Sequence, residues 1–182
     1  QKIGNYAFSQ SKIEEIFIPS NLTQIQKAAF ELCQNLKRIE FPNDSKLNSI
    51  ESYVFHGSSI NEIKIPSHVA QIKCYAFGCC NKLEKVEFAE NSELKYIKSF
   101  VFREAAIKKI SLPSSLISMD EYCFAECSQI EEVNFAPNSK LQSIGSFSFY
   151  ESSLKFFKIP SNVTELKENW CYVMTEAKVM PN

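Results

Sequence analysis

Apolar residues return along this chain at two alternating intervals, and that alternation is its most informative pattern. The segments that follow each short polar turn begin at Leu22, Leu47, Val69, Leu94, Leu116, Leu141 and Val163. Successive starts are 25 and then 22 residues apart, so the repeating unit is a pair of repeats about 47 residues long. A fixed internal period of this length is typical of a solenoid, in which each repeat buries its apolar face against its neighbours.

Five apolar columns keep their register inside every repeat. Three residues after each start stands an aliphatic side chain, and five residues further on stands a second, aromatic column. The aromatic column consists of Phe8, Phe30, Phe55, Phe77, Phe102, Phe124 and Phe149. The remaining columns belong to stretches such as residues 36–41, where apolar and polar residues alternate with the period of a β-strand. Each repeat is therefore predicted to supply one short strand, and the strands are predicted to stack as a parallel sheet.

These columns predict an α/β solenoid, a right-handed coil of about eight rungs with its parallel β-sheet on the concave side. The returns on the convex side, such as residues 26–30, are too short for long helices. Single helical or 3₁₀ turns, or a second set of very short strands, are expected there. Residues 1–182 are expected to form one domain, with residues 163–182 as an atypical C-terminal rung or cap. No polar cap precedes Ile3, so we expect a piece of a longer array, or self-association through the N-terminal edge.

The columns also resemble a known repeat. The sequence Leu36-Lys37-Arg38-Ile39-Glu40-Phe41-Pro42, followed later by Ile72-Lys73-Cys74-Tyr75-Ala76-Phe77-Gly78-Cys79-Cys80, is similar to the BspA-type leucine-rich repeat. The resemblance covers about residues 3 to 170 and implies a leucine-rich-repeat fold. It also implies a protein exposed on the surface of bacteria or parasitic protists. Adhesion to host cells or matrix proteins, or aggregation of cells, is the function that the resemblance implies.

Composition and charge argue against several other classes of protein. The chain holds 20 basic and 21 acidic residues, mixed along its length, which lacks the basic footprint of a nucleic-acid binder. No run of eighteen apolar residues is present, so no membrane span is expected in this chain. The nucleophile-elbow, zinc-protease and phosphate-loop motifs are absent, and His56 and His68 occupy different places in the repeat. Neither an enzymatic activity nor a cofactor is therefore expected.

The seven cysteines fall in a regular pattern. Cys33, Cys80 and Cys127 occupy the same place in successive long repeats, and cysteine-bearing rungs are never adjacent. Equivalent strands two rungs apart are separated by roughly 9–10 Å, beyond the reach of a disulfide. We therefore predict reduced, buried cysteines that act as small apolar side chains, with a bridge inside one rung, such as Cys123 with Cys127, as the alternative. No metal site is expected, because a C-x₂-C spacing with histidine partners is missing.

The outward residues of the predicted strands are the candidate ligand-binding residues on the concave face. They are Glu15, Phe17, Arg38, Glu40, Glu62, Lys64, Lys85, Glu87, Lys109, Glu132, Phe156 and Lys158. Two interpretations stay open. The opposite charges along Glu15–Arg38–Glu62–Lys85 and along Glu40–Lys64–Glu87 either pair with each other across neighbouring strands, or form a mixed-charge groove for a protein or glycoprotein ligand.

Two further sets of residues are candidates for interaction or modification. An aromatic column two residues before each phenylalanine is expected to be half-exposed and to serve either in packing or in an interface. It consists of Tyr6, Tyr53, Tyr75, Phe100, Tyr122 and Phe147. Asn21, Asn43 and Asn162 each begin a glycosylation sequon in a predicted turn.

The leading hypothesis is a non-catalytic protein-binding repeat module, located at the cell surface or outside the cell. As an adhesin-like protein it would mediate attachment to host cells, matrix or other cells. The alternative is an intracellular, cytoplasmic scaffold or regulatory leucine-rich-repeat protein, which unbridged cysteines and the lack of a visible leader favour. A third class is an accessory domain of an enzyme whose catalytic domain lies elsewhere in the gene.

Overall fold

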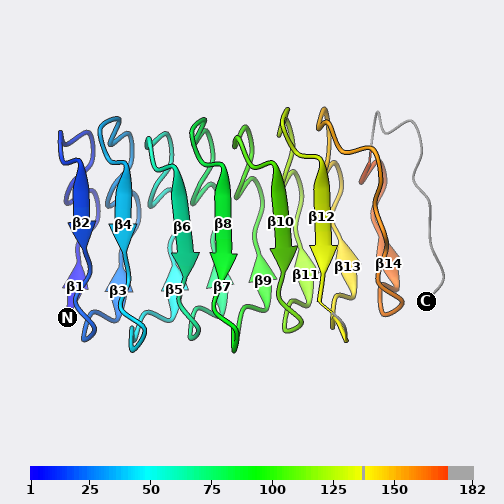
Figure 1. The fold of residues 1–182 in the computed structure, drawn as a ribbon, viewed down its shortest axis with the longest axis horizontal. Helices are drawn as coiled ribbons and strands as arrows, with labels where there is room; N and C mark the ends of the chain where they lie inside the picture. Colours follow the sequence, from blue (N-terminus) through cyan, green and yellow to red (C-terminus); the bar gives the residue numbers. More distant parts are fainter. Residues whose placement is uncertain (137, 172–182) are drawn as a thin grey trace.

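The computed structural model describes residues 1–136 and 138–171 as a row of similar rungs (Figure 1). In each full rung a short strand lies on one face, a turn segment follows, and a longer strand returns on the opposite face. The described residues contain no helix, and so none that is long and apolar enough to cross a membrane.

The short strands form one continuous parallel sheet of eight strands, in the order of the chain. They are β1 (Lys2–Ile3), β3 (Gln24–Ile25), β5 (Ser49–Ile50), β7 (Gln71–Ile72), β9 (Tyr96–Ile97), β11 (Ser118–Met119), β13 (Ser143–Ile144) and β14 (Glu165–Leu166). The register places Ile25 opposite Ile50 and Ile72 opposite Ile97, so the predicted aliphatic column is a row of side chains one rung apart. The predicted second set of very short strands is therefore confirmed.

The longer strands do not form the single continuous sheet that the sequence predicted. They are β2 (Glu15–Phe17), β4 (Arg38–Glu40), β6 (Glu62–Ile65), β8 (Lys85–Phe88), β10 (Lys109–Leu112) and β12 (Glu132–Phe135). They pair as β2 with β4, β6 with β8, and β10 with β12. Figure 1 shows wider intervals between these pairs. No backbone hydrogen bond joins β8 to β10, both of which lie wholly in the described residues.

The wider intervals follow the alternation of long and short repeats. Each is lined by the half-buried phenylalanine that ends the preceding long repeat, namely Phe41, Phe88 or Phe135. Short repeats end in the smaller Ile18, Ile65 and Leu112 instead. Since a packed interior transmits differences in side-chain volume, the bulkier ring separates the next pair of rungs. The spacing of the long strands therefore alternates with the length of the repeats, and the concave position expected for this sheet stays a prediction.

The phenylalanine column forms the centre of the core, as predicted. Its seven rings stack in one continuous row, and all but Phe8 are fully buried. Where the long strands of two neighbouring rungs pair, the centroids of their phenylalanine rings are 5.2, 5.3 and 5.2 Å apart. Across the wider intervals the centroids are 5.5, 5.5 and 5.4 Å apart. The core therefore carries the same two-rung period as the long strands.

Left-handed residues explain why the turn segments are not helical. Tyr53 and Gly57 have φ angles of 62° and 65°, and nearly every rung has left-handed residues at these two positions. A right-handed helix cannot continue through such residues. The backbone N–H groups of the turn donate alternately to the next rung and to their own rung. Phe55 donates to the carbonyl oxygen of Ala76 in the next rung, and Ser58 donates to that of Phe55 in its own rung. The expected helical or 3₁₀ turns are thus replaced by turns that are hydrogen-bonded from rung to rung.

The C-terminal end of the described residues packs on the last rings of the core. Trp170 lies 5.2 Å from Phe157 and 6.4 Å from Phe149, measured between ring centroids. Residues 172–182 lie outside the described residues, so the predicted cap over residues 163–182 stays a prediction, as does self-association through the N-terminal edge.

Candidate functional site

The twelve predicted ligand-binding residues all lie on one surface, here called the long-strand face. It consists of the outward residues of β2, β4, β6, β8, β10 and β12, with the equivalent residues 155–158 of the next rung. Ten of the twelve are exposed, and Glu40 and Glu132 are half-buried. Phe17 and Phe156 are 63% and 64% exposed. The strand register sets Glu15 beside Arg38, Glu62 beside Lys85, and Lys109 beside Glu132.

The charges of this face pair differently from the predicted ladders. Lys109 reaches Glu132 on the neighbouring strand, 3.0 Å away, as cross-strand pairing requires. Arg38, however, pairs with Glu40 on its own strand, and Lys85 pairs with Glu87 on its own strand at 2.7 Å.

The wider interval between β4 and β6 separates Arg38 from Glu62. On the paired strands, however, Arg38 and Lys85 contact carboxylates of their own strands although Glu15 and Glu62 lie beside them in the register. Glu15, Glu62 and Lys64, all in the described residues, make no ion pair. All three side chains are exposed to solvent.

Hydrogen bonds shift the ionisation of the paired groups in the direction that favours both charges. The hydrogen bond with Glu132 raises the pKa of Lys109, and the bond with Glu87 raises that of Lys85. The pKa of Glu132 is lowered first by Asn134 and then by Lys109. These shifts favour the charged forms of Lys85, Lys109 and Glu132.

A second charged column, which the sequence interpretation missed, borders the face. It consists of the residue just before each outward strand position: Glu14, Lys37, Asn61, Glu84, Lys108, Glu131 and Lys155. Lys37 pairs with Glu14 at 3.3 Å and Lys108 with Glu84 at 3.0 Å, both between neighbouring rungs. The sequence did contain a signal for this second column, because its residues stand immediately before the predicted outward residues of each strand.

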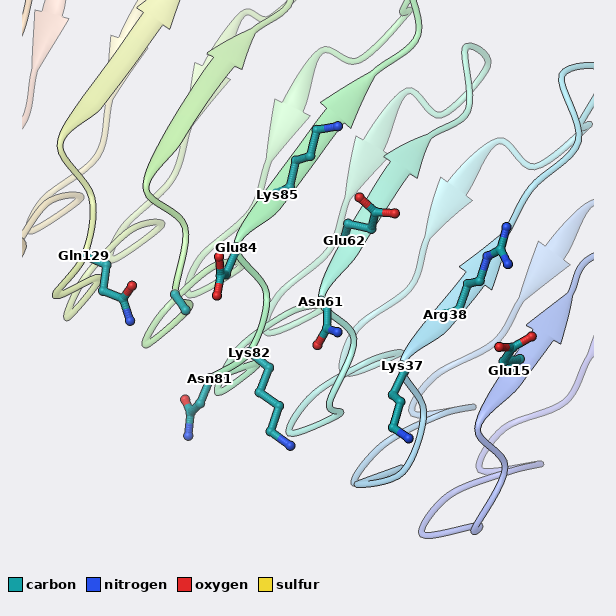
Figure 2. Close-up of a pocket in the computed structure, with 11 residues that line it drawn as sticks. Glu15, Lys37, Arg38, Asn61, Glu62, Asn81, Lys82, Glu84, Lys85 and Gln129 are labelled. Atoms are coloured by element: carbon teal, nitrogen blue, oxygen red, sulfur yellow. The ribbon is translucent and has the colours of Figure 1, made fainter.

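An open depression of about 750 Å³ runs across the starts of the long strands. Figure 2 shows its charged and amide side chains, which come from several successive rungs. Its lining includes Glu15, Lys37, Arg38, Asn61, Glu62, Asn81, Lys82, Glu84, Lys85 and Gln129. Sites for small molecules are mostly apolar and enclosed, with few polar groups. This surface is wide and polar instead, which favours a macromolecular partner.

Two grooves in the wider intervals are equivalent sites four rungs apart. One is lined by Phe41, Lys64 and Pro66, and the other by Phe135, Lys158 and Pro160. Each combines a half-buried aromatic ring with an exposed ammonium group. The sequence interpretation placed the two lysines on the binding face but missed the phenylalanines beside them, because these belonged to a core column.

The second aromatic column forms a ladder on the edge of the array. Tyr53, Tyr75, Phe100, Tyr122 and Phe147 are half-buried and stack with ring centroids 5.0, 4.6, 4.8 and 5.0 Å apart. Burial raises the pKa of Tyr53. Tyr6 is 53% exposed and lies outside the ladder, because the next rung has Ala28 in this place. Since the rings cover each other's faces, the ladder serves packing.

Four of the seven cysteines are buried as predicted, whereas Cys74, Cys79 and Cys171 are half-buried. All seven are free, and Cys33, Cys80, Cys123 and Cys127 are buried. Burial raises the pKa of Cys80 and of Cys127 to about 12, so both remain neutral thiols at physiological pH. In residues 1–136 and 138–171, no three His, Cys, Asp or Glu side chains converge as metal ligands would.

The three predicted glycosylation sites differ in accessibility. Asn21, Asn43 and Asn162 are all exposed. The Nδ2 of Asn162 donates to the carbonyl oxygen of Ser139 at 2.6 Å, and Ser45 of the second sequon is buried. Asn21 is thus the most accessible of the three, and glycosylation stays a prediction.

Comparison with known proteins identifies the repeat. The family model of the BspA type leucine rich repeat region (6 copies) matches residues 1–93 and 48–175. A leucine-rich repeat protein from Bacteroides ovatus is similar to the chain with a TM-score of 0.64 and 29% identity, over 91% of this chain and 48% of that one. The pneumococcal vaccine antigen PcpA is similar with a TM-score of 0.52 and 21% identity, over 91% and 63%.

The chain thus spans about half to two thirds of the length of these solved structures. No relative was found among the curated proteins. The family model nevertheless covers nearly the whole described chain, and the columns that it matches are the ones that stack in the core. The chain therefore belongs to the BspA-type leucine-rich-repeat family.

Proposed function

We propose that this chain is the non-catalytic protein-binding module of a surface-exposed or secreted, adhesin-like protein that attaches to host cells, matrix or other cells. The observation that carries the proposal is the long-strand face. It presents free charges at Glu15, Glu62 and Lys64 and exposed rings at Phe17 and Phe156, on a scaffold whose fold generally serves binding. Aromatic rings surrounded by charged residues are typical of protein interfaces.

Location is tested by antibody labelling of intact source cells, compared with permeabilised cells. Labelling of intact cells is the expected result. Attachment is tested with the purified chain on host cells and matrix proteins, beside a Phe17→Ala/Phe156→Ala variant. We expect the variant to bind more weakly, and a Tyr6→Ala variant, which removes an exposed ring away from this face, to bind as the parent does. Equal binding by all three proteins would reject the long-strand face as the attachment surface.

A second candidate function is that of an intracellular scaffold or regulatory repeat protein. The seven free cysteines favour it, because reduced thiols persist in the cytosol and not in oxidising compartments. Labelling of the source cells only after permeabilisation would select this function and reject the adhesin.

A further inference from the structure

The two most exposed large apolar side chains in the described residues lie at opposite ends of the long-strand face. Phe17 is on β2 and Phe156 is in the rung after β12. Seven successive rungs contribute to this face, and β8 belongs to the central one. Phe17 therefore lies three rungs before the centre and Phe156 three rungs after it.

Four pairs of corresponding positions on either side of β8 carry charges of opposite sign. Lys37 and Arg38, two rungs before the centre, correspond to Glu131 and Glu132, two rungs after it. Closer to the centre, Glu62 corresponds to Lys109, and at the ends Glu14 corresponds to Lys155. Each of these residues stands in the same column as its counterpart, at the same height along the strand.

This antisymmetry is the property that a surface needs to bind itself. In a two-fold symmetric dimer, a residue that contacts a second residue of the partner is matched by the reciprocal contact. A two-fold axis parallel to the strands reverses the order of the rungs and keeps each column facing itself. Lys37 and Arg38 of one copy then face Glu131 and Glu132 of the other. An axis along the array would instead keep each rung facing itself, so the contacts of Lys37 and Arg38 with Glu131 and Glu132 would not form.

From these relations we infer that the long-strand face binds a second copy of this chain, with the two arrays antiparallel and the two β8 strands facing each other. The inference names the partner of the same face and so rests on the proposed function. Glu62, Glu131 and Lys155, all described residues, make no ion pair within one copy, and each gains an oppositely charged neighbour in the dimer.

The size and shape of the face are sufficient for this contact. Three outward residues in each of seven rungs supply about 20 side chains, the number that a standard interface takes from each partner. The long strands all lie on one face of the array (Figure 1), so the contact extends along the row of rungs. On the axis the central rung faces itself, so Glu84, Lys85 and Glu87 each meet their own counterpart and have residues of the opposite sign as their next neighbours along the strand.

Charge reversal with rescue tests the inference. Sedimentation of the purified chain is expected to show a dimer that weakens as salt rises, because some of the attraction is electrostatic. Lys37→Glu/Arg38→Glu and Glu131→Lys/Glu132→Lys should each be monomeric, since each sets like charges on one another. A mixture of these two variants should dimerise again, because both contacts are then attractive. The variant with all four changes should dimerise by itself.

A matched control separates these effects from a general change of charge. Lys46→Glu/Lys140→Glu alters the net charge by the same amount at two exposed loop positions and should leave the dimer unchanged. Circular dichroism establishes that every variant is folded. The inference would be overturned by a parent chain that stays monomeric. It would also be overturned if both the Lys37→Glu/Arg38→Glu variant and the Glu131→Lys/Glu132→Lys variant remained dimers. Neither outcome affects the proposed function, which is measured by labelling and attachment to cells.

Discussion

The thiol of Cys80 donates a hydrogen bond to the backbone carbonyl oxygen of Phe55, one rung earlier, across 3.0 Å. Cys127 makes the same bond to Phe102, at 3.0 Å, and Cys33 makes it to Phe8, at 2.9 Å. Each bond joins a long repeat to the short repeat before it. These are the same rungs whose long strands pair, so the cysteines belong to a two-rung structural unit.

Alkaline conditions should destabilise the protein through two of these thiols. The pKa of a cysteine is near 9 when exposed and about 12 for buried Cys80 and Cys127. Between these values the unfolded chain has lost a proton that the folded chain keeps. The free energy of unfolding is therefore undiminished below pH 9 and falls by roughly 1.4 kcal/mol per pH unit for each thiol as pH rises toward 12.

Urea unfolding at several pH values measures this slope, and the Cys80→Ala/Cys127→Ala variant is its control. The variant is expected to be less stable near neutral pH and to lose less of its stability above pH 9. The same pH dependence in the parent and the variant would show that these thiols are not the cause.

Loss of a central ring should be costly. Phe77 is fully buried and stacks on Phe55 at 5.3 Å and on Phe102 at 5.5 Å. Phe77→Ala leaves a cavity in the row of rings and should lower the free energy of unfolding by about 3–5 kcal/mol. Equilibrium denaturation in urea gives the value. A loss below about 1 kcal/mol would contradict the central role of this column.

The second aromatic ladder gives a prediction with an internal control. Phe100 stacks on Tyr75 at 4.6 Å and on Tyr122 at 4.8 Å, whereas Tyr6 stacks on no ring of the described residues. Since each aromatic pair contributes about 0.5–1.5 kcal/mol beyond its buried area, Phe100→Ala should cost at least about 1–3 kcal/mol. Tyr6→Ala should change stability by less than about 0.5 kcal/mol. Thermal unfolding compares the two, and equal effects would refute a stabilising ladder.

Removal of a free charge should leave the fold intact. Lys64 is exposed and makes no ion pair within the described residues. Lys64→Ala should therefore change the free energy of unfolding by no more than about 0.5 kcal/mol. A larger loss in urea denaturation would mean that this side chain belongs to the stabilising network and not to the surface left open for a partner.

The sequence was sufficient for the centre of the core, because the same columns are buried in each of the central rungs. Ile25, Phe30 and Leu36 were assigned inward positions from their columns, and all three are buried. The backbone of the turn segments was harder to predict. Residues such as Tyr75 and Cys79 adopt left-handed angles that glycine or asparagine usually signals, and neither residue type stands there. Hydrogen bonds to the next rung, which only the stacked structure supplies, compensate for this local strain.

The sequence was sufficient to predict which residues lie on the long-strand face, but not which of them form ion pairs with each other. Period-two alternation placed Arg38 and Lys85 outward, and both are exposed. Both form ion pairs with a carboxylate two residues further along their own strand, which the alternation does not distinguish from the carboxylate beside them on the neighbouring strand. The difference between paired and separated strands comes from the volume of rings such as Phe41, an effect of packing that charge patterns do not contain.

Tension along the array would meet two kinds of boundary in turn. Within a strand pair, backbone hydrogen bonds join the two rungs on both faces of the array. Between the pairs that meet at β8 and β10, the long strands make no such bond, and only the short-strand face and the turns are hydrogen-bonded. Rungs should therefore detach in pairs. A pulled molecule would lengthen in steps of one 47-residue unit, or roughly 160 Å of extended backbone. In the proposed attachment role, such stepwise yielding would dissipate load while the rest of the array stays folded.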